Sequence, residues 1–497
     1  MVDIIDLEEK IHIDDYEAVA YLTSVVKDLK EKAKSIVPDL KDRTIWMVNS
    51  SVHGGGVAEM LPRVISLMRD LGLDVRWAVL QSDRDDFFRI TKNIHNLIHD
   101  SGKTDLDQEK REIYESVNRQ NADDLKTHLN PGDILIAHDP QPMALGRMLK
   151  SDTDIHTIWR SHIGIADHTE RTRHAWEFLQ PYADGFDTAV FTSDEYVPDY
   201  FQDNYRIIHP AIDPFNHKNR ELEPVKIMGI LCNAGMAKPR HPVLTPPFEK
   251  TAHRLQKNGH FAPAVQPEEM GLMFRMTVAQ ISRWDRLKGF LPLMQGFAEM
   301  KMGSRDRSDS EWDCRRHKKM IEIVRLVLAG PDPESIQDDP EGREVVEELK
   351  AAYREFPDWV QDDIAILALP MDSRKRNSLM VNVLQQVSSV VVQNSLQEGF
   401  GLTAAEAMWK RKPVLVSNAS GLLEQIEDGR NGAVNPDPAN KTAVAETLES
   451  LLRRGTDRER LAGNAQQAVY AKFLVFTQVG DWLETLKAVV EQKGRSA

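Results

Sequence analysis

The chain has 497 residues, of which 41% are hydrophobic and 28% are charged, and its formal net charge is -14. This length predicts two or three globular domains with sizeable cores, and the acidic balance argues against nucleic-acid binding as the main role, because polyanions would be repelled. No run of about 18 apolar residues occurs, so we predict no membrane-spanning segment. The acidic amino-terminal stretch lacks the apolar core of a signal peptide, and we therefore expect a cytoplasmic protein.

Metal and disulfide chemistry has little support in the sequence. The two cysteines, Cys232 and Cys314, form neither a CxxC pattern nor a disulfide framework. HExxH, EF-hand and Walker A motifs are absent. We expect no required cofactor and no bound metal, and the sequence does not imply Mg²⁺.

The first half of the chain alternates predicted strands with predicted helices. Apolar residues at helical spacing predict an amphipathic helix over residues 14–37, ended by Pro38. A helix over 57–71 follows the first strand. The predicted strands are 44–50, 73–79, 133–139, 156–162, 187–193 and 206–213. This order predicts βαβ units and a parallel sheet.

A second alternating series follows an interruption. Residues 228–270 are rich in proline and lysine, and we expect them to form an inserted surface loop. The predicted strands beyond it are 274–282, 324–330, 363–370, 388–394 and 413–419, with a helix over 287–300, a charged connection over 303–319 and mostly helix over 439–492. The fold class is therefore α/β, with two Rossmann-like, doubly wound domains. Ligands bind such sheets at the carboxyl ends of their strands, and so loops after strands are the candidate sites.

The first candidate loop is HGGGVAE, residues 53–59, between a strand and a helix. Its consecutive glycines, including Gly55 and Gly56, allow the backbone amides to approach a ligand closely. The helix amino terminus adds partial positive charge. The loop favours a phosphate or other anion over a simple tight turn.

The second candidate loop is SRWDRLKG, residues 282–289, which also follows a strand. Arg283 and Lys288 are five residues apart and would meet on one diphosphate, Arg with a planar fork and Lys as a point charge. Taken alone, this loop is better explained by two solvated surface charges.

The most specific motif is QNSLQEGFGLTAAEAMWKRKPVLVSN, residues 393–418. Glu398 stands at the end of a strand, where a carboxylate can accept hydrogen bonds from sugar hydroxyls, and Glu406 lies in the helix that follows. The alternative makes Glu398 a helix cap and Glu406 a surface acid. The motif also fits a loose G-x-G-x-x-A dinucleotide fingerprint, which keeps a dehydrogenase open as a remote alternative.

Two further motifs place polar residues at strand ends. WRSHIG, residues 159–164, contains His162, which can bind a sugar hydroxyl or act on a proton. HDPQP, residues 138–142, contains Asp139 and Gln141, which can bind hydroxyls, although Asp139 fits a helix cap equally well.

Together these motifs resemble retaining glycosyltransferases of the GT-B fold and family-4 type. HGGGVAE, SRWDRLKG and EGFGLTAAEAMWKRKPV carry the likeness, the last with its Glu, seven residues, Glu signature. HDPQP, WRSHI and IHPAIDP are similar to the glycosyltransferring trehalose synthases and the retaining trehalose phosphorylases. The likeness extends from about residue 40 to the carboxyl terminus and fails at 228–270 and 303–319.

The resemblance implies two domains facing a central cleft. Residues 1–215, with 473–497 crossing back, would form the acceptor domain, and residues 216–472 the nucleotide-sugar donor domain. The implied catalytic residues are His162, Arg283, Lys288 and Glu398. The implied donor-binding residues are Gly55, Gly56, Arg283, Lys288, Glu398, Gly399, Phe400, Gly401, Leu402 and Glu406, and the acceptor-binding residues are Asp139, Gln141 and His162.

The function implied is transfer of glucose from a nucleoside diphosphate glucose to a small sugar or polyol, with glucose as acceptor to give trehalose. A retaining trehalose phosphorylase, which uses phosphate, is the alternative. The subgroup often carries an acidic residue where this chain has Gly164, and so the acceptor can differ. Only small sugar substrates are expected as partners, and a homodimer is left open.

Overall fold

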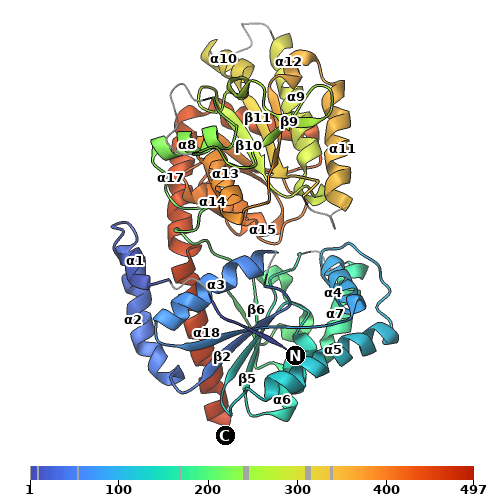
Figure 1. Cartoon of the computed structure of the whole chain (residues 1–497), viewed down its shortest axis with the longest axis vertical. Helices are drawn as coiled ribbons and strands as arrows, with labels where there is room; N and C mark the ends of the chain where they lie inside the picture. The colour runs from blue at the N-terminus through green and yellow to red at the C-terminus, as the bar shows by residue number, and fades with distance from the viewer. Residues whose placement is uncertain are drawn as a thin grey trace. The chain divides into compact units, whose positions relative to one another are not determined.

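The chain folds into two compact α/β units, shown in Figure 1. The computed structural model describes residues 2–7, 11–52, 55–166, 169–238, 246–307, 315–335 and 340–496. Unit 1 comprises Met1–Ala211 and Lys472–Ala497, and unit 2 comprises Ile212–Ala471. Among the described residues, no helix is both long and apolar enough to cross a bilayer.

Unit 1 is built on a sheet of order β1-β3-β2-β4-β5-β6-β7. Its strands are β1 (Asp3–Ile5), β2 (Thr44–Asn49), β3 (Asp74–Val79), β4 (Ile134–His138), β5 (His156–Arg160), β6 (Thr188–Phe191) and β7 (Tyr205–Ile207). All neighbouring pairs are parallel except β1 with β3. The carboxyl ends of β2, β4 and β5 therefore lie side by side at one edge of the sheet.

Helices cover the sheet of unit 1. They are α1 (Ile13–Glu17), α2 (Thr23–Leu40), α3 (Gly55–Asp70), α4 (Asp85–Ile98), α5 (Gln108–Lys126), α6 (Met143–Asp152), α7 (Glu170–Leu179) and α18 (Val475–Ser496), with short helices η1 (Gln180–Gly185), η2 (Asp194–Tyr196) and η3 (Asp199–Phe201). Helix α18 packs on α2 and α3, although more than 400 residues separate them in sequence (Figure 1). Gln478 fixes it by donating a hydrogen bond to the His209 carbonyl at 3.0 Å.

Unit 2 contains a sheet of order β15-β14-β13-β10-β11-β12-β8-β9. Its strands are β8 (His253–Leu255), β9 (Phe261–Pro263), β10 (Thr277–Ile281), β11 (Arg325–Pro331), β12 (Ile364–Leu369), β13 (Val390–Gln393), β14 (Val414–Ser417) and β15 (Ala433–Asn435). The strands from β10 to β15 pair in parallel, whereas β8 and β9 pair antiparallel at the edge next to β12.

The helices of unit 2 lie on both faces of its sheet. They are α8 (Pro224–Asn233), α9 (Phe290–Asp306), α10 (Arg315–Ile323), α11 (Pro340–Glu355), α12 (Asp358–Gln361), α13 (Arg374–Val387), α14 (Leu402–Trp409), α15 (Ser420–Leu423), α16 (Lys441–Arg453) and α17 (Gly455–Lys472), with short helices η4 (Pro267–Met270) and η5 (Arg286–Lys288). Two apolar clusters fill the space between helices and sheet, one around Leu326 and one around Leu367.

The predicted alternation of strands and helices is confirmed, with three corrections. The single helix expected over 14–37 is wrong: it breaks into α1 and α2, and α2 continues past Pro38 to Leu40. Pro38 lies in the last turn, and the buried Leu40 fixes the end of the helix. The second correction is an addition to the predicted parallel sheets, because β1, β8 and β9 pair antiparallel at sheet edges.

The third correction concerns the segment 228–270, which is not simply an inserted loop. Its first part belongs to α8, and β8 and β9 form a hairpin that extends the sheet of unit 2 beyond β12. The turn between them contains Gly259 with a φ of 85°, a backbone conformation in which glycine is strongly favoured. Residues 239–245 of this segment, and 308–314 of the charged connection with Cys314, lie outside the described residues.

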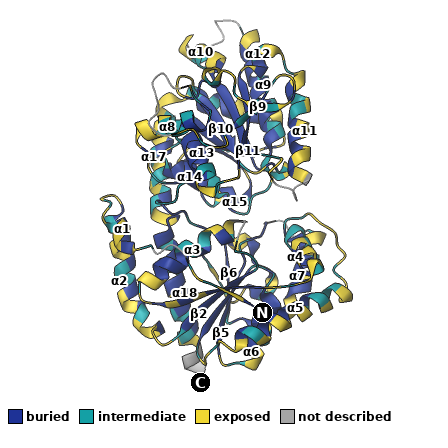
Figure 2. Ribbon diagram, in the orientation of Figure 1, coloured by how far each residue is buried: buried dark blue, intermediate teal, exposed yellow. Residues whose placement is uncertain are grey.

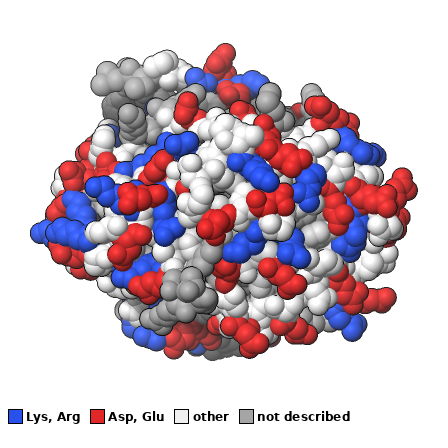
Figure 3. Space-filling view, turned by 90° about the horizontal axis from the view of Figure 1, so that it is seen from below, with Lys and Arg blue, Asp and Glu red and all other residues white. Residues whose placement is uncertain are grey.

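Burial follows the layers of each unit. The central strands of both sheets, such as β2, β4, β10 and β12, are buried, the edge strands β1, β7 and β9 are partly exposed, and the helices expose one face (Figure 2). On the face shown in Figure 3, acidic and basic side chains alternate, and neither sign forms a continuous patch. The net charge of -14 is thus not gathered into one acidic region on that face.

Candidate functional site

Unit 2 brings two of the predicted site residues into direct contact. Lys288 Nζ lies 2.7 Å from Glu398 Oε2, and the two side chains are 16% and 12% exposed. Lys288 follows β10 and Glu398 follows β13, which are adjacent parallel strands. Since parallel strands end at the same edge of a sheet, residues 110 positions apart in the chain meet here.

The Glu398 carboxylate is held by more than the lysine. Its Oε2 also accepts hydrogen bonds from Ser395 Oγ at 3.0 Å and Gln393 Nε2 at 3.3 Å. These donors fix the orientation of the carboxylate. Glu398 is not a helix cap, because the residue that precedes α14 is Gly401. Gln393, the last residue of β13, and Ser395 both lie within the motif 393–418, but their residue types alone predicted no role for them.

Two glycines make the approach of these loops sterically possible. Gly289 has a φ of 62°, and a Cβ there would lie 2.0 Å from the Asn394 carbonyl oxygen. Gly401 has a φ of 84°, and its Cβ would lie 2.5 Å from Leu422 and 3.1 Å from Glu398. Only glycine fits both the backbone conformation and the space. The loop after β10 thus packs directly on the loop after β13.

Three other predicted donor residues follow Glu398 closely in the chain. Gly399, Phe400 and Leu402 belong to the same loop and the start of α14, and Phe400 is buried. Glu406 is 8% exposed and is therefore not a surface acid. The Arg283 side chain is 73% exposed, and its guanidinium lies 4.0 Å from the Asp285 carboxylate. A shared diphosphate site of Arg283 and Lys288 stays a prediction.

Lys410 is a further residue of this region that the sequence analysis missed. Its ammonium group donates to Gln385 Oε1 at 2.7 Å and to the Glu406 carbonyl at 3.1 Å. Burial lowers the pKa of Lys410 to about 7. Lys410 belongs to the run WKRK, which places cations at the carboxyl end of α14. Cations at that end of a helix interact favourably with the helix dipole.

Unit 1 places a histidine pair at the edge of its own sheet. His138, at the end of β4, and His162, after β5, stack with ring centroids 5.2 Å apart and planes at 14°. His138 Nδ1 and His162 Nε2 are 2.9 Å apart, a hydrogen bond in which one ring donates and the other accepts. The buried His138 Nε2 has no hydrogen-bond partner among the described residues.

Burial keeps both histidines neutral. It lowers the pKa of His138 to about 3, with a further contribution from the nearby Arg160 guanidinium. The pKa of His162 is lowered well below its ordinary value by burial, by Arg160 and by His138. Neutral imidazoles donate and accept single hydrogen bonds and carry no charge, which suits contact with hydroxyl groups.

Asp139, the residue after His138, holds the backbone of His162 in place. It has a φ of 67°, which is uncommon outside glycine, and its Oδ1 accepts a hydrogen bond from the His162 amide at 2.8 Å. Burial raises the pKa of Asp139 to about 6. Asp139 does not cap α6, which Pro142 precedes. The Gln141 Oε1 atom nearby is buried without a hydrogen-bond partner among the described residues.

The glycine loop is placed at the same edge, after β2. Gly55 begins α3, and a Cβ on Gly56 would have no neighbour within 4 Å. His53 and Gly54 lie outside the described residues. Gly164, where an acidic residue was expected, packs on Tyr196: a Cβ there would lie 2.5 Å from the tyrosine Cβ and Cγ atoms. The Tyr196 ring fills the place of a side chain at position 164.

In the part of the chain that the structure describes, no three His, Cys, Asp or Glu side chains come together in a way that could hold a metal ion. Cys232 is a free cysteine, and burial raises the pKa of its thiol.

Comparisons with known proteins cover nearly the whole chain. Residues 47–198 match the family described as "Trehalose synthase, N-terminal domain", and residues 374–468 match "Glycosyl transferases group 1". A trehalose synthase of Thermococcus litoralis is 30% identical over 459 residues, which is 92% of this chain and 93% of that one. A trehalose phosphorylase of Pleurotus sajor-caju is 26% identical over 92% of this chain and 60% of its own length.

Solved structures agree on the architecture. An α,α-trehalose 6-phosphate synthase from Burkholderia multivorans superposes with a TM-score of 0.64 at 16% identity, over 91% of this chain and 98% of that chain. A second structure, described as "Trehalose-6-phosphate from E. coli bound with UDP-2-fluoro glucose", gives a TM-score of 0.62 at 14% identity, over 89% and 99%. At these identities the likeness concerns the fold, which is GT-B.

Proposed function

Since this chain belongs to the trehalose synthase family of GT-B glycosyltransferases, we propose that it transfers glucose with retention from a nucleoside diphosphate glucose to a small sugar or polyol. Glucose, which would give trehalose, is the first acceptor to test. The observation that carries this proposal is the Lys288–Glu398 pair, held at adjacent strand ends of unit 2.

We assign the donor to unit 2, Ile212–Ala471, which includes most of the predicted donor domain 216–472. Cleavage of the bond between the sugar and the diphosphate develops negative charge on the leaving oxygen. A preorganised cation close to that oxygen stabilises the transition state. Lys288 supplies this charge, and it is fixed in place by Glu398. Glu398 in turn is oriented to accept hydrogen bonds from the sugar hydroxyls, and Glu406 lies in the helix that starts beside it.

We assign the acceptor to unit 1, where Asp139 and Gln141 follow β4 and His162 follows β5. His162 is neutral and binds an acceptor hydroxyl without creating an ion pair. In the transfer, the bond from the anomeric carbon to the diphosphate oxygen breaks and a bond to the acceptor oxygen forms. The acceptor proton passes to the departing phosphate on the same face, so that neither a carboxylate nucleophile nor a metal takes part. The glycine loop with Gly55 and Gly56 carries backbone amides at the start of α3, and such amides suit an anion.

A substrate panel tests the proposal directly. Purified protein is incubated with ADP-, GDP- or UDP-glucose against glucose, fructose and glycerate, with and without inorganic phosphate. The expected result is a nucleotide-dependent disaccharide or glucoside whose anomeric configuration, read by nuclear magnetic resonance, is that of the donor. Mg²⁺ chelation is expected to leave the rate unchanged.

The same panel separates the alternatives. Release of glucose 1-phosphate from trehalose that requires phosphate and no nucleotide would replace the synthase with a phosphorylase, the activity named for the Pleurotus relative. Absence of transfer from every donor, with a nicotinamide absorbance in the purified protein, would favour the dehydrogenase alternative.

A further inference from the structure

Unit 2 contains a large cavity away from the Lys288–Glu398 pair. Its volume is about 1600 Å³, and it is lined by α8, by the chain around Leu272 and Met273, and by the outer face of α13. Ligand pockets usually have roughly 300–1,000 Å³. The cavity is therefore larger than a monosaccharide requires, and it involves none of the residues assigned to transfer.

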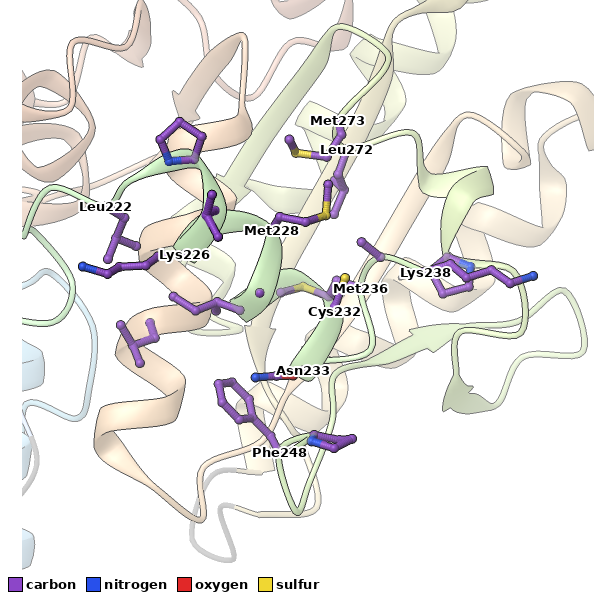
Figure 4. Close-up of a pocket in the computed structure, with 18 of the residues that line it drawn as sticks. Leu222, Lys226, Met228, Cys232, Asn233, Met236, Lys238, Phe248, Leu272 and Met273 are labelled. Atoms are coloured by element: carbon purple, nitrogen blue, oxygen red, sulfur yellow. The ribbon is translucent and has the colours of Figure 1, made fainter. Parts of the chain in front are cut away.

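The wall of this cavity is apolar and adaptable. Met228, Met236 and Met273 line it together with Leu222 and Leu272, and Figure 4 shows these side chains grouped around α8. Methionine is flexible and polarisable, and it accommodates apolar ligands of varied shape. Two large apolar residues of the wall, Val225 and Phe274, are 81% and 73% exposed. Exposed apolar side chains that gather in one wall indicate a surface that binds an apolar partner.

Helix α8 itself has the composition of a buried element. Its sequence, PVKIMGILCN, is apolar on nearly all sides, and helices of that kind are normally covered. On the cavity side a Cβ at Gly229 would meet no atom within 4 Å. An apolar chain can thus lie along this helix next to its backbone.

The charged residues of the cavity have the opposite sign to the protein as a whole. Among the described lining residues are four cations, Arg220, Lys226, Lys238 and Arg376, and one acid, Glu268, in a chain of net charge -14. Three of these cations have acidic partners, because Lys238 lies 3.9 Å from Glu268, Lys226 lies 3.7 Å from Glu223 and Arg376 lies 3.4 Å from Asp372. The buried Arg220 Nε has no hydrogen-bond partner among the described residues. A buried guanidinium nitrogen without a partner beside an apolar wall favours an anionic group.

From this combination we propose that the cavity binds an amphipathic carboxylate of the long-chain fatty acid class. The acyl chain lies among the methionines and along Gly229, and the carboxylate accepts hydrogen bonds from the guanidinium of Arg220. This inference is independent of the proposed transfer reaction, because its test measures binding alone.

Chain length is the first test. Delipidated full-length protein is titrated calorimetrically with octanoate, decanoate and dodecanoate, each below its micelle concentration, and with 1-dodecanol. Burial of one methylene contributes about 0.8 kcal/mol, which is roughly a fourfold change in Kd. We therefore expect dodecanoate to bind on the order of 10²-fold more tightly than octanoate, and roughly tenfold more tightly than the uncharged alcohol. Affinity independent of chain length would overturn the proposal.

Two glycine variants locate the site. Gly229→Trp fills the open side of α8 and is expected to lower dodecanoate affinity by at least roughly tenfold. Gly463→Trp is the matched control, since Gly463 also lies in a helix, α17, with no atom within 4 Å of its Cβ, and lies outside the cavity. Circular dichroism verifies that both variants fold. Equal affinities in the two variants would contradict the assignment.

A third variant tests the headgroup and does not depend on the folding of the tryptophan variants. Arg220→Met removes the guanidinium and keeps an apolar side chain of similar length. We expect dodecanoate binding to fall to the level of 1-dodecanol, with the affinity of the alcohol unchanged. A preference for the carboxylate that survives this substitution would refute the role of Arg220.

Discussion

The two units place opposite kinds of chemistry at the same position of the same architecture. At the strand ends of unit 1, His138 and His162 form a pair that burial keeps uncharged. At the strand ends of unit 2, Lys288 and Glu398 form an ion pair whose side chains are 16% and 12% exposed. The loops that follow the strands of a parallel sheet can thus carry neutral or charged side chains, and their sequence decides which.

The difference indicates what each edge can bind. Neutral imidazoles discriminate hydroxyl groups by single hydrogen bonds, whereas a fixed ammonium group stabilises a diphosphate that gains negative charge. If the assignment of acceptor to unit 1 and donor to unit 2 is correct, substitutions in the two clusters will have different signatures. The following experiments compare them.

The largest effect is expected at Glu398. Glu398→Ala removes a carboxylate that orients both Lys288 and, in our proposal, the donor sugar, and we expect transfer to be abolished while the far-ultraviolet circular dichroism is preserved. Glu427→Ala serves as control, because Glu427 is a 65% exposed acid paired with Arg430 in the same unit. An unfolded Glu398→Ala protein would show instead that the carboxylate has a structural role.

The second effect is expected at Lys288. Lys288→Ala removes one preorganised positive charge, and we expect kcat to fall by at least ~10²-fold, as when one oxyanion donor is lost. The matched control is Arg286→Ala in the same short helix η5, because Arg286 is an exposed cation bound to Glu344 and Glu348. Turnover near the wild-type value at saturating donor would exclude the proposed role of Lys288.

The smallest effect concerns pH and is specific to unit 1. The pKa of His138 is lowered to about 3 in the folded protein, so that below its ordinary value of 6.5 the unfolded chain holds a proton that the folded chain lacks. This histidine therefore destabilises the folded state as pH falls from 6.5 to 5. Its contribution is at most about 1.4 kcal/mol per pH unit.

His138→Gln should remove this penalty, so that the variant gains stability relative to wild type as pH falls. Comparison with wild type is needed because Asp139 and Asp481, whose pKa values are raised to about 6, act with the opposite sign. Urea unfolding is followed by pulsed hydrogen exchange of β4 and β5, with β10 and β13 of unit 2 as internal reference and the exposed His128→Gln as control variant. A difference between variant and wild type that is constant from pH 6.5 to 5 would contradict the neutral pair.

Much of this architecture follows from local patterns in the sequence. The strands β2, β4 and β5 are runs of apolar and β-branched residues, and glycine or polar residues mark the loops at their ends. Strand-end positions singled out the loops that contain Lys288 and Glu398, and the family resemblance assigned both residues to the donor site, although more than one hundred residues separate them. Their direct ion pair required the pairing of β10 with β13 and the two glycines that let the loops touch, which no local pattern encodes.

The misses have physical causes as well. The β8–β9 hairpin has strands of three residues each, too short for a periodicity signal, yet the Asn258-Gly259 dipeptide at its turn is a hairpin signal that was available. Donor and acceptor identity stay predictions, since neither is encoded in the residues at the two edges alone.

The contact of Gly164 with Tyr196 has a consequence for redesign of this enzyme. The aromatic ring already occupies the volume that any larger residue at 164 would need, so replacement of the glycine by aspartate alone should misfold the strand end rather than alter acceptor preference. A library that seeks new acceptors should therefore vary the two positions jointly, with a small residue at 196 whenever 164 is enlarged. During evolution, substitutions at positions 164 and 196 would therefore depend on each other and would be accepted as a pair.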